Sequence, residues 1–166
     1  MAISMYQASV PVLQKMLKNL DGILDKAVAS AEARKFDPAI LLNARLAPDM
    51  YAFTRQVQVA TDHAKGGPAR LAGLEPPKFE DKETSFAELK ARVARVQDFL
   101  ATLKPAQIDG SEERKIVLKF GPREFEFTGL PYLTQFVLPN FFFHYTTAYA
   151  ILRHNGVDVG KRDFAG

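Results

Sequence analysis

Residues 3–31 read ISMYQASVPVLQKMLKNLDGILDKAVASA, and this stretch decides the class of fold. Apolar side chains recur in it at alternating steps of three and four: Ile3, Tyr6, Val10, Leu13, Leu17, Leu20, Leu24, Ala27 and Ala31. Such spacing places them on one face of a helix in heptad phase. A seam of this length suits a long helix that packs at shallow angles against its neighbours, as in a four-helix bundle. Pro11 leaves two starts open: a helix capped by Ser9, or a helix that begins near Ser4 and bends at the proline.

Proline and glycine mark the next helices. Asp37-Pro38 predicts a short helix over residues 39–43, because aspartate caps a helix and proline suits its first turn. Pro48-Asp49 repeats the pair and predicts the start of a second long helix. We expect Gly66-Gly67-Pro68 to interrupt or end that helix, with a final turn through Leu71 left open.

The second half of the chain predicts a helix, a hairpin and a helix. A loop over residues 73–82 is followed by Ser85 and Glu88, whose spacing is that of a capping box. The helix that they begin ends near Lys104-Pro105. Two alternating segments, 114–120 and 123–128, flank Gly121-Pro122 and predict a β-hairpin. A hairpin so short is not stable alone, so we expect one of its faces to be covered by the bundle.

The last predicted helix runs from about Pro131 to His154, with Gly156 just after its end. Asn140 and His144 lie one turn apart in the middle of its apolar face, so we expect a buried polar pair there. Together these elements predict an all-α protein, a four-helix bundle with a short β-hairpin before the last helix. We expect residues 1–166 to form one domain.

Composition excludes several classes of function. The chain has no cysteine, which excludes disulfides, thiolate ligands and a cysteine nucleophile. The amino-terminal residues 1–6 lack the basic and apolar regions of a secretory signal, and no apolar run is as long as a membrane span. The net charge of +3 is spread along the chain rather than gathered in a basic patch, which argues against nucleic acid as a partner. We therefore expect a cytoplasmic protein without a membrane or nucleic-acid partner.

The chain contains three histidines, and only one is placed to carry chemistry. His63 and His154 sit at predicted helix ends, where a solvated imidazole is common. His144 faces the interior, and Asn140, Gln56 and Asp49 are the polar residues that could line a pocket with it. His144 and His154 are ten residues apart, about 15 Å along a helix, so they cannot share a metal ion. The residues alone therefore predict no cofactor.

Three stretches resemble the DinB/YfiT-like superfamily, and within it a bacterial branch described as a domain of unknown function. They are residues 46–50 (LAPDM), 139–144 (PNFFFH) and 148–156 (AYAILRHNG). The resemblance implies an up-down-down-up bundle, often a homodimer, in which three histidines bind a divalent metal such as Zn²⁺ or Ni²⁺. Residue by residue, only His144 matches a ligand. Asn140 stands where a histidine is expected, and the second helix offers Gln56 or Asp49.

Two functions follow from this pattern. The first is a bundle that has lost the three-histidine metal site and acts as a small-molecule-binding or dimeric module, with His144 in a core network. The alternative is a divalent-metal-dependent transferase or hydrolase of the DinB/YfiT type, in which His144 is a metal ligand or general base.

Overall fold

The computed structural model describes residues 3–166, the side chain of Phe120 excepted. Met1 and Ala2, part of the segment expected to lack a secretory signal, lie outside the described residues. The elements in chain order are α1 (Met5–Arg34), α2 (Ala39–Asn43), α3 (Phe53–Leu71), α4 (Phe86–Thr102), α5 (Pro105–Ile108), β1 (Lys115–Phe120), β2 (Arg123–Thr128), α6 (Gly129–Pro131), η1 (Tyr132–Val137), α7 (Leu138–His154) and α8 (Lys161–Ala165).

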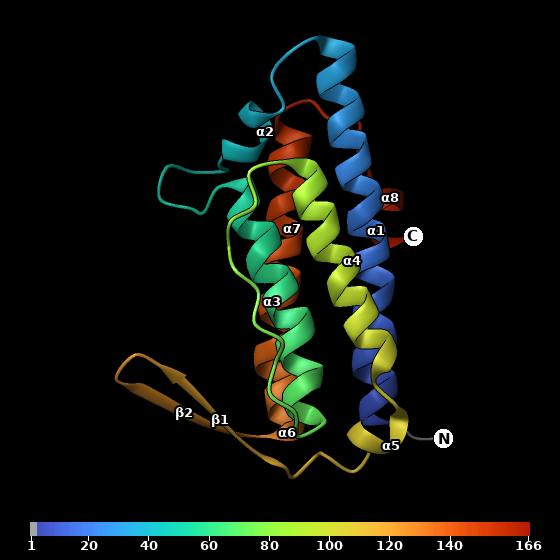
Figure 1. Cartoon of the computed structure of the whole chain (residues 1–166), viewed down its shortest axis with the longest axis vertical. Coiled ribbons are helices and arrows are strands. Elements are labelled where there is room, and N and C mark those ends of the chain that lie inside the picture. The colour runs from blue at the N-terminus through green and yellow to red at the C-terminus, as the bar shows by residue number, and fades with distance from the viewer. Residues whose placement is uncertain (1–2) are drawn as a thin grey trace.

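The long helices α1, α3, α4 and α7 form a four-helix bundle (Figure 1). The chain ascends in α1, descends in both α3 and α4, and ascends again in α7. This is the predicted up-down-down-up course, and the fold class is confirmed. Two parallel neighbours such as α3 and α4 require a long return connection, which residues 72–85 supply by running back along the bundle (Figure 1). The described residues contain no helix that is long and apolar enough to cross a membrane.

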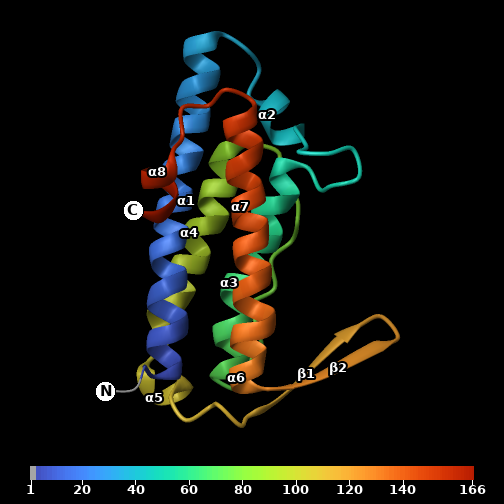
Figure 2. The same ribbon diagram turned by 180° about the vertical axis from the view of Figure 1, so that it is seen from behind.

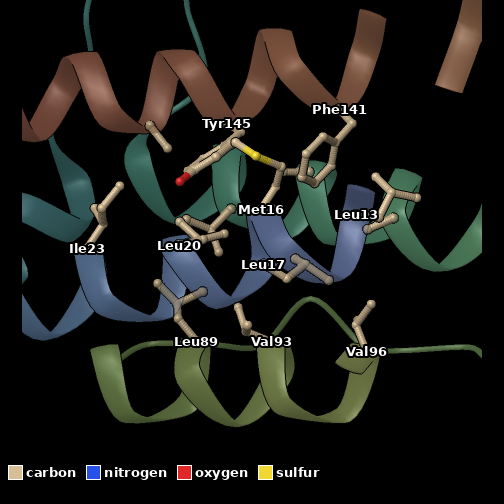
Figure 3. Close-up of a cluster of buried hydrophobic side chains, with 14 of the residues drawn as sticks. Leu13, Met16, Leu17, Leu20, Ile23, Leu89, Val93, Val96, Phe141 and Tyr145 are labelled. Atoms are coloured by element: carbon tan, nitrogen blue, oxygen red, sulfur yellow. The ribbon is translucent and has the colours of Figure 1, made fainter. Parts of the chain in front are cut away.

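Helix α1 begins at Met5, which decides between the two predicted starts. The Ser4 side chain accepts a hydrogen bond from the Gln7 backbone N–H, and the Gln7 side chain accepts one from Ser4 N–H. This capping box holds the start, and Pro11 lies inside the helix. The heptad face is buried as predicted from Val10 onward, against α4 and α7 (Figure 3). The labelled members of this cluster are Leu13, Met16, Leu17, Leu20, Ile23, Leu89, Val93, Val96, Phe141 and Tyr145.

The prediction that Pro48-Asp49 opens the second long helix is wrong. The backbone N–H of Met50 donates to the Ala47 carbonyl, so Pro48 and Asp49 are the central residues of a turn. Residues 44–52 form a loop that closes where Phe53 N–H donates to the Ala44 carbonyl at 2.9 Å. Proline and aspartate favour turns as strongly as they favour helix starts. The hydrogen bond between Phe53 and Ala44 closes the loop and stabilises the turn.

The expected interruption at Gly66-Gly67-Pro68 is also wrong, because α3 continues through these residues to Leu71. A Cβ at Gly67 would lie 2.5 Å from Cγ1 of Val137. Gly67 therefore allows η1 to approach the backbone of α3 closely. The glycine serves packing between segments far apart in sequence, which a local pattern does not reveal.

The hairpin is confirmed, with strands β1 and β2 paired antiparallel from Lys115–Thr128 to Phe120–Arg123. Its base packs on the bundle, because Ile116 and Leu118 are buried. Its far end projects sideways from the foot of the bundle (Figure 2). The predicted last helix is built from three consecutive segments, α6, the π-helical η1 and α7.

Candidate functional site

Helices α3 and α7 lie side by side in the bundle and bring together two of the predicted site residues (Figure 2). The Nδ1 atom of His144 is 2.7 Å from Oε1 of Gln56. The Gln56 amide nitrogen donates to the Tyr51 carbonyl at 3.1 Å, which leaves Oε1 as the acceptor. Nδ1 of His144 is then the protonated ring nitrogen, and Nε2 carries the lone pair.

His63 also belongs to this site, although the sequence analysis predicted a solvated imidazole there. Because α3 does not end at the glycines, His63 lies within the helix, half-buried against η1 and α7. Its ring stacks on that of His144, with centroids 6.2 Å apart and planes 10° from parallel. It also meets the ring of Phe136 edge-on at 5.5 Å. The signal for His63 was its spacing of seven residues from Gln56, which repeats the same face of α3.

Both imidazoles are neutral at physiological pH. Burial, and next the charge of Arg55, lower the pKa of His144. Burial, and next the neighbouring His144, lower the pKa of His63 to about 4. Desolvation disfavours the charged form of each ring, and the pair cannot carry two positive charges at this distance without mutual repulsion. The pair therefore offers nitrogen donors and acceptors without charge.

The other two predicted residues lie elsewhere. Asn140 is half-buried on α7, and its amide donates to the Phe136 carbonyl of the preceding turn at 2.7 Å. Asp49 is exposed in the turn before α3. His144 itself is half-buried rather than fully enclosed, with Tyr51 and Phe143 rings beside it. The structure thus joins His144 to Gln56 and His63, and does not bring Asp49 to them.

The donor set does not fit the metal that the resemblance implies. Within residues 3–166, no group of three or more His, Asp or Glu side chains is arranged to hold a metal ion. His63 and His144 are the two imidazoles of this region, and their ring centroids are 6.2 Å apart. A shared ion would need both nitrogens at about 2.0–2.1 Å. The amide nitrogens of Gln56 and Asn140 donate to backbone carbonyls, and the amide oxygen of Gln56 faces Nδ1 of His144.

A cleft of about 360 Å³ is lined by His63, and its lining does not include Gln56, Asn140 or His144. It lies between α3, η1 and the base of β1, and the segment after α3 closes it at Pro76. Its lining is Arg55, Val59, Asp62, His63, Lys65, Gly66, Gly67, Arg70, Pro76, Leu118, Tyr132 and Phe136. The π-helical η1 contributes the two large rings; π-helical segments are rare and occur often at functional sites.

A buried arginine on α4 fixes the acidic side of the cleft. Arg92 is 1% exposed and forms ion pairs with Asp62, Asp81 and Glu83 at 2.7–3.0 Å. Asp62 lines the cleft, whereas Asp81 and Glu83 belong to the connection that returns along the bundle. This cluster anchors the connection to α3 and α4 and neutralises Asp62 from behind.

Comparison with known proteins agrees with this architecture. A family model described as a domain of unknown function, DUF1993, matches residues 5–165. The chain is also similar to a solved structure, a DinB family member protein from Shewanella denitrificans. The two are 44% identical, the match covers 97% of this chain and 91% of that one, and the TM-score is 0.87. No match was found among curated proteins. The chain therefore belongs to the DUF1993 family and is a member of the DinB family by its fold and sequence.

Proposed function

We propose that this protein is a small-molecule-binding module, and that its ligand occupies the cleft between α3, η1 and β1. The observation that carries the proposal is the composition of this cleft: aromatic rings from η1 and polar side chains from α3 line the same hollow. Ligand sites combine apolar walls with a few polar groups that fix the ligand, and 360 Å³ falls within the usual range of volumes.

The histidine pair supports this proposal in preference to metal chemistry. His144 is held in one tautomer by Gln56, and its ring stacks on His63, which lines the cleft. His144 and Gln56 are then positioning residues, because they orient His63 without facing the cleft themselves. Gln56 and Asn140, which stand near the position that the resemblance assigns to a metal, both use their amide nitrogens in hydrogen bonds to backbone carbonyls.

A fragment screen by protein-observed NMR tests the proposal. Neutral, anionic and cationic single-ring compounds are added to the ¹⁵N-labelled chain, and we expect chemical-shift changes at His63, Gly66 and Leu118. Val59→Trp fills the cleft and should abolish these changes, whereas Val117→Trp, on the exposed hairpin surface, should not. If no fragment binds, or if Val59→Trp leaves binding unchanged, the cleft is not a ligand site.

We further propose that the module is a homodimer, as the family resemblance implies, and that it resides in the cytoplasm, where a chain without cysteine suits the reducing conditions. Sedimentation equilibrium should give twice the 18.5 kDa of one chain. A monomer at micromolar concentrations would contradict the dimer. Fractionation of cells that express the tagged chain would test its location.

A further inference from the structure

We infer that the ligand of this cleft is a compound with one aromatic ring and one acidic group, and that the acidic group pairs with Arg70. This inference rests on the proposed function and adds the chemical class of the ligand. It follows from the charges of the cleft, from the hydrogen bonds of one arginine, and from the rings that face it.

The cleft has an excess of positive charge. Its charged lining residues are Arg55, Lys65, Arg70 and Asp62, three cations and one anion. Asp62 is already paired with Lys65 and with Arg92 behind it, both at 2.7 Å. Arg55 is paired with Asp81 at the rim. Among the described residues, Arg70 has no acidic partner, so its charge is the one left for a ligand.

The guanidinium of Arg70 is held with one edge available. Its Nη1 donates to the Gly66 carbonyl and to the Tyr132 hydroxyl, each at 3.2 Å. Nε and Nη2 have no partner within the described part of the chain. These two nitrogens form a fork that matches the two oxygens of a carboxylate or phosphate.

Gly66 is required for this arrangement. A Cβ at position 66 would lie 2.7 Å from Nη1 of Arg70, so any larger residue would push the guanidinium away from the carbonyl that holds it. Glycine inside a helix costs about 1 kcal/mol relative to alanine. The contact with Arg70 explains why α3 contains Gly66, although glycine destabilises a helix.

The aromatic side chains that line the cleft beside Arg70 are uncharged. Tyr132 and Phe136 stack with centroids 5.8 Å apart and planes 17° from parallel, and His63 continues the wall. Tyr132 is 1% exposed and its hydroxyl accepts a hydrogen bond from Arg70, so Phe136 and His63 offer the aromatic surface that a ligand can reach. A flat ring on this wall would gain apolar burial and ring contacts, with its acidic group directed at the arginine. The volume of about 360 Å³ is at the small end for ligand sites, which favours a single ring.

Titration of the ¹⁵N-labelled chain with four probes tests the inference. The probes are benzoate, phenyl phosphate, benzamide as a neutral analogue of benzoate, and inorganic phosphate as an acid without a ring. We expect benzoate or phenyl phosphate to bind at least tenfold more tightly than benzamide and than phosphate. Whichever of the two ring acids binds more tightly identifies the acidic group.

Matched variants separate pairing with Arg70 from general attraction of anions. Arg70→Gln should weaken the better ring acid on the order of 10- to 100-fold, the loss typical of a charged hydrogen-bonded contact. Arg70→Lys keeps the charge but loses the fork, and should recover only part of the affinity. Arg123→Gln makes the same charge change on the exposed hairpin and should have no effect. Circular dichroism of each variant confirms that it is folded.

Each outcome decides a different claim. If benzamide binds as tightly as benzoate, or if Arg70→Gln and Arg123→Gln behave alike, the acidic-ligand inference is overturned while the cleft remains a ligand site. If phosphate binds as tightly as phenyl phosphate, the requirement for a ring is overturned. If no compound of any charge binds in the fragment screen, the proposed function fails as well.

Discussion

Gly67 and Gly22 offer a matched pair of substitutions with opposite expected effects. Both glycines lie inside long helices, in α3 and α1 respectively. A Cβ at Gly22 meets nothing within 4 Å, whereas a Cβ at Gly67 would lie 2.5 and 3.0 Å from the two γ-carbons of Val137. Alanine should therefore stabilise the protein at one position and strain it at the other.

The magnitudes follow from two competing effects. Replacing glycine with alanine inside a helix contributes about 1 kcal/mol, so Gly22→Ala should raise the melting temperature by about 2–4 °C for a chain of this size. At Gly67 the same gain opposes overpacking of about 1–3 kcal/mol. Pro68 adds a further cost, because a Cβ on the residue before proline is disfavoured in helical conformation. We expect Gly67→Ala to be about 1–3 kcal/mol less stable than Gly22→Ala.

A double-mutant cycle with Val137→Ala isolates the contact. The effect of Pro68 is the same in both backgrounds, so it cancels in the cycle. Truncating Val137 removes the clashing γ-carbons, and Gly67→Ala should then be about 1–3 kcal/mol less damaging than in the parent chain. Urea unfolding followed by circular dichroism gives these free energies. If Gly67→Ala stabilises the protein as Gly22→Ala does, or if the coupling is absent, the close approach of η1 to α3 is not as described.

Three further predictions concern the charged and polar groups. Arg92→Met removes a cation from three carboxylates; Asp62 and Asp81 keep Lys65 and Arg55 as partners, whereas Glu83 loses its cation. The free energy of unfolding, measured with urea, should fall by about 3 kcal/mol, the lower end for a buried pair because Asp62 and Asp81 reach solvent. Because folding lowers the pKa of His63 from 6.5 to about 4, the folded state binds fewer protons than the unfolded chain between these values. Thermal stability should thus fall as the pH drops from 6.5 towards 4, and less steeply in His63→Gln. Gln56→Glu places a carboxylate on Nδ1 of His144 and should raise the pKa of that histidine, which NMR titration measures; an unchanged pKa would contradict the contact.

Local sequence patterns predicted an element correctly where the residues of the pattern favour only one local structure. The heptad seam of α1, the capping box at Ser85 and the alternating strands around Gly121 each have a short-range physical cause, and all three are present. Pro48-Asp49 has two short-range uses, a helix start and a turn. The hydrogen bond between Phe53 and Ala44 selects the turn, and it depends on a loop closure that no local pattern encodes.

The site was only partly predictable for the same reason. Gln56 and His144 lie on apolar faces of their helices, so their facing inward follows from periodicity. The prediction for His63 is wrong because glycines in sequence usually favour a helix end, whereas here Gly67 admits Val137 and Gly66 accommodates Arg70. Val137 belongs to η1 and Arg70 to the next turn of α3. The role of the two glycines therefore follows from the packing of these elements and not from the local sequence.

The two amides of the site form hydrogen bonds with other groups of the chain. A buried amide needs partners, and here Asn140 finds one in the preceding turn of its own helix while Gln56 joins the Tyr51 carbonyl to His144. Both amide nitrogens thus have partners within the chain, and Gln56 holds His144 in the tautomer whose lone pair is on Nε2. A histidine at position 140, one turn before His144 on the same helix, would add a second imidazole next to that lone pair. We therefore expect Asn140→His to bind Zn²⁺ more tightly than the parent chain, measured by isothermal titration. Equal binding by the two chains would mean that Nε2 of His144 cannot reach an ion shared with position 140.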